Sequence, residues 1–162
     1  MDPIAPNTVV ASKYRVLRKL GSGGMGVVVE VEHVEFPRRF ALKWIRPDVV
    51  GSDAEVRFKQ EAVVTGSLSH ENLVSIVDFG RGADGSAFMV MELLAGDTLA
   101  AQIRRSGPMP IGRVVHIVEQ VCAGLSAAHE RGIVHRDIKP SNLFCTTRGS
   151  MSTRSAWSHS RH

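Results

Sequence analysis

The chain has 162 residues, of which 43% are hydrophobic and 22% charged, so we expect a soluble globular protein with one domain or part of a larger one. No apolar run is long enough to span a bilayer, and the first six residues lack the basic and apolar blocks of a signal peptide, which predicts no membrane segment and a cytoplasmic location. Three arginines after residue 142 supply most of the net charge of +4, so residues 1–142 lack the basic face of a nucleic-acid-binding protein.

The two cysteines, Cys122 and Cys145, suit a reducing compartment. They do not form a Cys-x-x-Cys pair, and no histidine or cysteine has the spacing of a zinc site. We therefore expect both cysteines to be small residues of the core.

Two predicted strands, residues 14–20 and 27–32, flank a glycine-rich turn. The first has the composition of a strand, the second is β-branched and partly alternating, and the turn between them has the spacing G-x-G-x-x-G. In a dinucleotide-binding fold a helix opens at the last glycine, whereas a strand follows here, which favours a hairpin folded over a triphosphate. The motif alone is weak, and a plain glycine-rich hairpin explains it about as well.

A third predicted strand, residues 40–45, carries Lys43 inside an apolar run. A buried ammonium is costly unless it meets an anion, so Lys43 requires a partner; the alternative is a lysine at a strand edge whose stem reaches water. The capping-box spacing at residues 52–55 predicts a helix over residues 53–68. Glu61 on that helix is either the partner of Lys43 or a solvated surface acid.

Two further strands are predicted over residues 73–79 and 87–92, and a connecting segment follows at residues 92–97. Two helices are predicted after it, over residues 98–105 and 111–131. The last helix carries a wide apolar stripe and ends before Gly132; the stripe consists of Val114, Ile117, Val118, Val121, Leu125 and Ala128. Its histidines, His116 and His129, have no partner at ligand spacing and are predicted to be structural.

Residues 135–142 read His-Arg-Asp-Ile-Lys-Pro-Ser-Asn. Asp137, Lys139 and Asn142 place a base, a cation and a metal ligand on one short loop, which suits phosphoryl transfer. The alternative is a polar turn after a helix, since Pro-Ser-Asn is ordinary loop chemistry.

These segments, in this order, resemble the protein kinases, and in particular the bacterial serine/threonine kinases of the eukaryotic type. Residues 135–142 match H-R-D-x-K-P-x-N, residues 21–28 match G-x-G-x-x-G-x-V, and residues 41–43 match the V-A-I-K position. Lys139 separates the chain from the tyrosine kinases. The resemblance covers about residues 13–145 and implies an α+β, protein-kinase-like fold: an antiparallel five-stranded N-lobe with helix αC, and an incomplete helical C-lobe.

The resemblance also implies a division of the chain. We expect a polar N-terminal lead at 1–12 and a partial kinase domain at 13–145, with its N-lobe at 13–91, a hinge at 92–97 and a partial C-lobe at 98–145. Residues 146–162 are serine-rich and basic and lack an apolar period, which predicts a disordered tail.

By resemblance, the function is ATP-dependent transfer of the γ-phosphate to serine or threonine hydroxyls, with ATP and Mg²⁺ as cofactors. Asp137 would accept the proton of the attacking hydroxyl, Lys139 would offset charge on the transferred phosphoryl group, and Asn142 would hold one magnesium ion. Lys43, paired with Glu61, would bind the α- and β-phosphates.

The resemblance implies that the nucleotide contacts the glycine turn, the strands beside it and the hinge: Leu20, Gly21, Ser22, Gly23, Gly24, Gly26, Val28, Ala41, Lys43, Glu61, Met91, Glu92 and Leu94. Met91 would guard the back of the pocket, although it is equally plausible as a core residue. The backbone of Glu92 and Leu94 would be available to adenine.

In the family, two short strands lead on to D-F-G, whose Asp holds magnesium, and then to the activation loop and A-P-E; none of these follows Asn142 here. We therefore predict a kinase domain truncated after the catalytic loop and of doubtful activity, with a non-catalytic ATP-binding or partner-binding kinase fragment as the alternative. A phosphotransferase of the aminoglycoside-kinase type shares H-x-D-x-x-x-x-N but usually lacks the pattern of Arg136 and Lys139. The sequence does not identify the protein substrate, and the exposed stripe of residues 111–131 predicts self-association.

Overall fold

A computed structural model describes residues 4–23, 26–45, 69–82, 84–135, 138–146, 151–153 and 158–159. The chain divides into two compact units. The first unit comprises residues 1–62 and 76–93, and the second comprises residues 63–75 and 94–162. The helix predicted over residues 53–68, with Glu61, lies outside the described residues. Within them, no helix is long and apolar enough to cross a bilayer.

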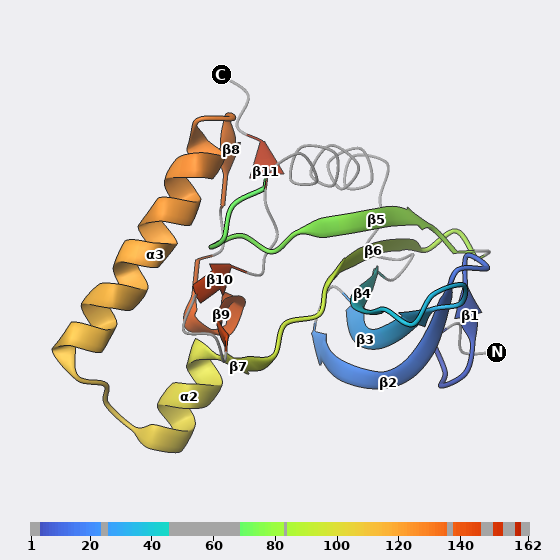
Figure 1. The fold of residues 1–162 in the computed structure, drawn as a ribbon, viewed down its shortest axis with the longest axis horizontal. Helices are drawn as coiled ribbons and strands as arrows, with labels where there is room; N and C mark the ends of the chain where they lie inside the picture. The colour runs from blue at the N-terminus through green and yellow to red at the C-terminus, as the bar shows by residue number, and fades with distance from the viewer. Residues whose placement is uncertain are drawn as a thin grey trace. The chain divides into compact units, whose positions relative to one another are not determined.

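The first unit is built on one six-stranded antiparallel sheet (Figure 1). In spatial order its strands are β1 (Val9–Val10), β2 (Tyr14–Gly23), β3 (Gly26–His33), β4 (Arg39–Ile45), β6 (Ala87–Glu92) and β5 (Ile76–Arg81). A strand, not a helix, begins at Gly26, which confirms the predicted hairpin and excludes the dinucleotide-binding arrangement. The predicted antiparallel sheet is therefore present, with the two-residue β1 added at its edge.

One face of this sheet forms the apolar core. The core residues alternate along their strands and are each at most 5% exposed: Val10, Tyr14, Val16, Val29, Val31, Phe40, Leu42, Trp44, Phe88 and Val90. Trp44 stacks on Phe88 with ring centroids 6.2 Å apart. Because burial of each large apolar side chain contributes about 1.5–3 kcal/mol, this face stabilises the unit. The residues that alternate with this core project to the opposite face of the same strands.

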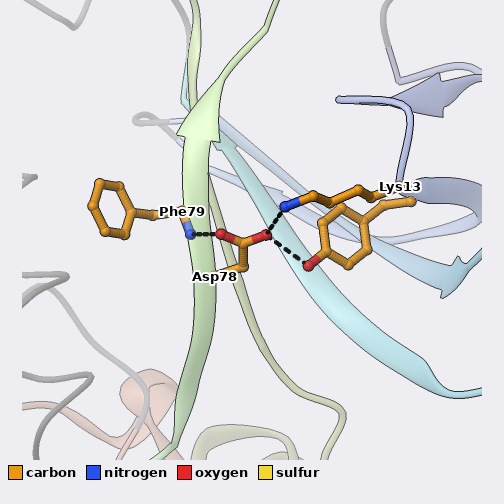
Figure 2. A network of polar contacts seen from close by, with 4 residues as sticks. Lys13, Asp78 and Phe79 are labelled. Carbon is orange, nitrogen blue, oxygen red and sulfur yellow. Dashed lines mark hydrogen bonds and ion pairs between the residues drawn. The ribbon is translucent and has the colours of Figure 1, made fainter.

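A polar network joins β2 to β5, which are not neighbours in the sheet (Figure 2). The Tyr14 hydroxyl donates to Asp78 Oδ2 at 2.8 Å, and Lys13 Nζ lies 3.3 Å from the same oxygen. The backbone N–H of Phe79 donates to Asp78 Oδ1 at 2.8 Å. Burial, and then the hydrogen bond to Asp78, raise the pKa of Tyr14, so the hydroxyl keeps its proton. The curl of the sheet is therefore held by a buried donor and a carboxylate 64 residues apart.

In its described residues, the second unit contains two α-helices, one short 3₁₀ helix and two small sheets. The helices are α2 (Leu99–Ser106) and α3 (Ile111–His129), followed by the short 3₁₀ helix η2 (Pro140–Asn142). One sheet has the order β10-β9-β7 and the other β11-β8; the strands are β7 (Gly96–Thr98), β8 (Ile133–Val134), β9 (Leu143–Thr146), β10 (Met151–Thr153) and β11 (Ser158–His159). The Thr98 side chain caps α2 by accepting from the N–H of Ala101.

The apolar stripe predicted for α3 is only partly buried. Ile117 and Val121 pack with Leu99, Leu143 and Cys145, and Ala128 packs with Leu73 and Ile133. Val114 and Val118, however, are 44% and 52% exposed, which agrees with the expectation that part of the stripe lacks a partner. The periodicity identified the helix correctly, and three of the six stripe residues, Ile117, Val121 and Ala128, are buried.

Two short strands lie within residues 146–162, for which the sequence predicts disorder. Met151–Thr153 pairs antiparallel with β9, with Met151 opposite Cys145. Ser158–His159 pairs with β8, with Ser158 opposite Val134. Strand pairing uses backbone groups and needs no apolar period, which is why composition gave no sign of it. The domain boundaries remain a prediction.

Candidate nucleotide and catalytic site

Four of the predicted nucleotide contacts share the face of the first sheet that lies opposite the apolar core. In the strand register, Val28 of β3 is opposite Lys43 of β4, and Ala41 of β4 is opposite Met91 of β6. Side chains directly opposite one another in an antiparallel sheet project to the same face, and Ala41 and Lys43 are two residues apart. The structure therefore brings together Val28, Ala41, Lys43 and Met91, and we call this the candidate face.

Lys43 lies in an interior strand, because β4 is between β3 and β6. The alternative of a lysine at a sheet edge therefore does not hold. Its side chain is half-buried, while its neighbours Leu42 and Trp44 belong to the core on the other face. Glu61, its predicted partner, lies outside the described residues, so that pair remains a prediction.

The glycines of the turn differ in whether the surrounding structure leaves room for a side chain. Gly26 has φ +155°, and a Cβ at this position would overlap the backbone carbonyl of Trp44. Gly21 and Gly23 have no positive φ, and no atom of the described residues lies within 4 Å of a Cβ built at either position. The fold thus explains glycine at position 26 but not at 21 or 23, where an open backbone suits the close approach of a ligand. Leu20 is half-buried, Ser22 is exposed, and Gly24 lies outside the described residues.

The predicted hinge lies at the junction of the two units. The first unit ends at Leu93 and the second resumes at Leu94. Glu92 is the last residue of β6 and is paired with Phe40 in β4. Both Glu92 and Leu94 are half-buried, and their backbone contacts with a base remain a prediction.

The predicted catalytic loop connects β8 to β9 within the second unit. His135 is 6% exposed at the start of the loop, and the N–H of Asn142 donates to the carbonyl of Lys139 at 2.8 Å, which closes η2. Leu143 and Cys145, directly after the loop, are anchored in the core against α3. The loop is therefore held at both ends by buried residues; Arg136 and Asp137 lie outside the described residues.

Asn142 is the one predicted metal ligand that the described residues include. Mg²⁺ takes oxygen ligands, and the half-buried Asn142 offers an amide oxygen of that type. Lys139 is exposed, as a group that meets a substrate phosphoryl must be before binding. The amide oxygen is a donor of the type that Mg²⁺ takes, and the role of Asn142 as a ligand remains a prediction.

The tripeptide Asp-Phe-Gly does occur in the chain, at residues 78–80, in the edge strand β5. Both oxygens of Asp78 accept hydrogen bonds, one from Tyr14 and the other from the N–H of Phe79 (Figure 2). Asp78 thus closes the curl of the sheet. The tripeptide sequence alone would have assigned Asp78, a structural carboxylate, as a metal ligand.

Sequence reasoning missed one group on the candidate face. Glu30 of β3 is opposite Ala41 in the register, and only 2% of its surface is exposed. It forms ion pairs with Arg18 and Arg39. The available signal was an acidic residue inside a run of valines, next to the glycine turn.

Comparison with known proteins shows the family and the fold of the chain. Residues 14–153 match the family described as the protein kinase domain. Among curated proteins, the chain is 40% identical over 140 residues to serine/threonine-protein kinase pkn3 of Myxococcus xanthus, covering 86% of this chain and 26% of that protein. It is 36% identical over 143 residues to serine/threonine-protein kinase PrkC of Bacillus subtilis, and this match covers 88% of this chain and 22% of that protein. Among solved structures, the Mycobacterium tuberculosis PknI kinase domain superposes with a TM-score of 0.84 at 31% identity, covering 93% of this chain and 62% of that one.

The fold and the matched residues define a protein kinase domain. The chain belongs to the protein kinase family, as a member of the eukaryotic-like serine/threonine kinases of bacteria. The predicted kinase-like fold is confirmed. The chain spans about a quarter of the length of the curated relatives named here.

Proposed function

We propose that the chain binds ATP with Mg²⁺ on the candidate face, and that its residues serve the transfer of the γ-phosphate to serine or threonine hydroxyls of a protein substrate. The observation that carries the proposal is the shared face of Val28, Ala41, Lys43 and Met91 beside the glycine turn. In a family of protein kinases, ATP is the nucleotide this face would take.

The order of groups along the face suits a nucleotide lying in one direction. Lys43 is opposite Val28, two residues from the start of β3 at Gly26, and Ala41 lies about 7 Å further from the turn along β4. Ala41 and Met91, which are 0% and 8% exposed, would form the apolar side of the adenine site, with Val28 beside them. The cationic Lys43 and the open glycine backbone lie toward the phosphates. The base therefore points toward the hinge and the triphosphate toward the glycine turn.

The catalytic loop supplies the groups for transfer. We assign to Asp137 the removal of the hydroxyl proton, to Lys139 the neutralisation of charge on the moving phosphoryl group, and to Asn142 one magnesium ligand. Magnesium, when bound, neutralises charge on the phosphates and orients them. General-base catalysis contributes only about 10²- to 10⁴-fold. Positioning and electrostatics must therefore carry most of the rate.

The second candidate function is a chain that binds nucleotide without transferring phosphate. It is favoured by two observations on the described residues: Asn142 is the one predicted metal ligand among them, and Asp78, the acid of the Asp-Phe-Gly at residues 78–80, is bound to Tyr14 and to the N–H of Phe79. If the described residues contribute Asn142 alone, Mg²⁺ is held chiefly by the phosphates and water, and Mg²⁺·ATP binds weakly.

We also propose that the chain acts in the cytoplasm and that α3 mediates self-association. Ile111, Val115 and Val118 are 83%, 50% and 52% exposed. Their spacing of four and three residues puts them on one stripe of the helix. Such a stripe is a candidate contact for a second copy of the chain.

Titration of a fluorescent ATP analogue with the 162-residue chain tests nucleotide binding. Lys43→Met should weaken binding about tenfold or more, because a charge-assisted contact with phosphate is lost. The matched control is Lys19→Met, which removes an exposed lysine opposite the core residue Val29. Equal affinities of the wild type and Lys43→Met would contradict the role given to Lys43.

A further inference from the structure

Glu30 is a buried carboxylate that joins two strands across a third. Its Oε1 accepts a hydrogen bond from Arg39 Nη1 of β4 at 3.1 Å. Its Oε2 lies 2.6 Å from Arg18 Nη2 of β2, a close charge contact whose alignment does not make a hydrogen bond. The acid is 2% exposed, whereas the arginine side chains are 68% and 60% exposed. The cluster therefore consists of one desolvated anion held by two cations from the surface.

This arrangement is more than a surface ion pair. Pairs between exposed groups contribute little, because water screens them. A buried carboxylate that loses its partners keeps its desolvation penalty, so removing them is costly. Glu30 therefore binds β2 and β4 to β3 more firmly than exposed charges would.

The cluster is placed where the β2–β3 hairpin has irregular register. Register shifts lie between Val16 and Arg18 and again between Lys19 and Gly21, so Arg18 sits between two irregularities. Such irregularities leave residues unpaired and alter the local twist and direction of a strand. The contact of Arg18 with Glu30 fixes the register between them. Two residues beyond the second shift, β2 ends in the glycine turn.

The same carboxylate borders the candidate face. Glu30 is directly opposite Ala41 and is two residues along β3 from Val28. Glu30 thus lies beside Ala41, at the proposed base-binding end of the face. Through Arg18 it also contacts β2, the strand that leads into the glycine turn at the proposed phosphate-binding end.

We propose that Glu30 is a positioning residue for the nucleotide: through Arg18 it sets where the glycine turn lies over the phosphates, and through Arg39 it holds β4 beside β3. This inference rests on the proposed binding of ATP to the candidate face. Glu30 acts through the two arginines and does not itself touch the nucleotide.

The test compares the affinities of ATP and adenosine for each variant of the full chain. Glu30→Gln should weaken ATP binding about tenfold and adenosine binding less, because the glycine turn serves the phosphates, which adenosine lacks. Arg18→Met, which leaves the Glu30–Arg39 pair in place, should act in the same direction. Glu32→Gln is the matched control: Glu32 is on the same strand and face, and is half-buried.

A uniform loss of stability would not change the ratio of the two affinities. If Glu30→Gln and Arg18→Met keep the wild-type ratio while Lys43→Met lowers it, the positioning role is overturned and the proposed function stands. If the wild-type chain binds neither compound, both are overturned. Amide hydrogen exchange at Leu20, Gly21 and Ser22, measured without nucleotide, should be faster in Arg18→Met than in Glu32→Gln; equal exchange in the two variants would also overturn the inference.

Discussion

Replacing Gly26 by alanine should destabilise the first unit strongly. A residue with a side chain is strained at φ +155°, at a cost of about 1–3 kcal/mol. The new Cβ would also overlap the Trp44 carbonyl, a backbone atom that cannot rotate away, and overpacking of this kind adds about 1–3 kcal/mol. The sum, about 2–6 kcal/mol, is a large part of the roughly 5–15 kcal/mol that stabilises a typical domain.

Urea unfolding followed by tryptophan fluorescence measures this effect, because Trp44 is buried in the core of the same unit. With a slope of about 2 kcal/mol per molar urea, the midpoint for Gly26→Ala should fall by about 1–3 M. Gly21→Ala is the matched control, since its Cβ meets no described atom within 4 Å, and its free energy of unfolding should change by about 0.5 kcal/mol or less. If the two variants unfold at the same urea concentration, the argument that the backbone at Gly26 requires glycine is wrong.

Three further outcomes follow from the structure. Tyr14 is the single tyrosine of the chain, so ultraviolet absorbance should show tyrosinate only well above the ordinary tyrosine pKa of about 10. Because the pKa of Tyr14 is raised in the folded state, its contribution to stability is complete below the ordinary pKa and is lost as the pH rises through the raised one. Asp78→Asn should lower the pKa of Tyr14, and an unshifted titration of the wild type would contradict the burial of this hydroxyl. Val118→Asp should reduce self-association measured by sedimentation, and an unchanged sedimentation profile would rule out this face of α3. Autophosphorylation by the 162 residues alone should be undetectable or nearly so with labelled ATP, and robust transfer abolished by Asp137→Asn would show that a second carboxylate holds the metal.

Local patterns were sufficient to predict most of the elements. The decision between a hairpin and a dinucleotide-binding turn depended on whether a strand or a helix follows Gly26, and the β-branched run after it settled that choice. Helix α3 was predicted from its apolar period, with its end near Gly132, which has φ +72°. These features depend on contacts between residues close in sequence.

Features that depend on the order of strands could not be predicted in the same way. Only the sheet order shows that Lys43 lies in an interior strand. The burial of Glu30 depends on arginines from two other strands, and an acid in an alternating strand is ordinarily assigned to the solvent face. The role of Asp78 depends on Tyr14, 64 residues away. Spacing in the sequence carries no information about such pairings.

Methyl NMR during titration with Mg²⁺·ATP tests whether the nucleotide binds at the candidate face. The candidate face and the core face alternate along the same strands, so their methyl groups differ in orientation and not in local sequence. Binding at the candidate face should shift the methyl signals of Val28, Ala41 and Met91, while those of Val31 and Val90 should stay nearly unchanged. Shifts of equal size on both faces, or shifts confined to the core face, would contradict nucleotide binding at the candidate face.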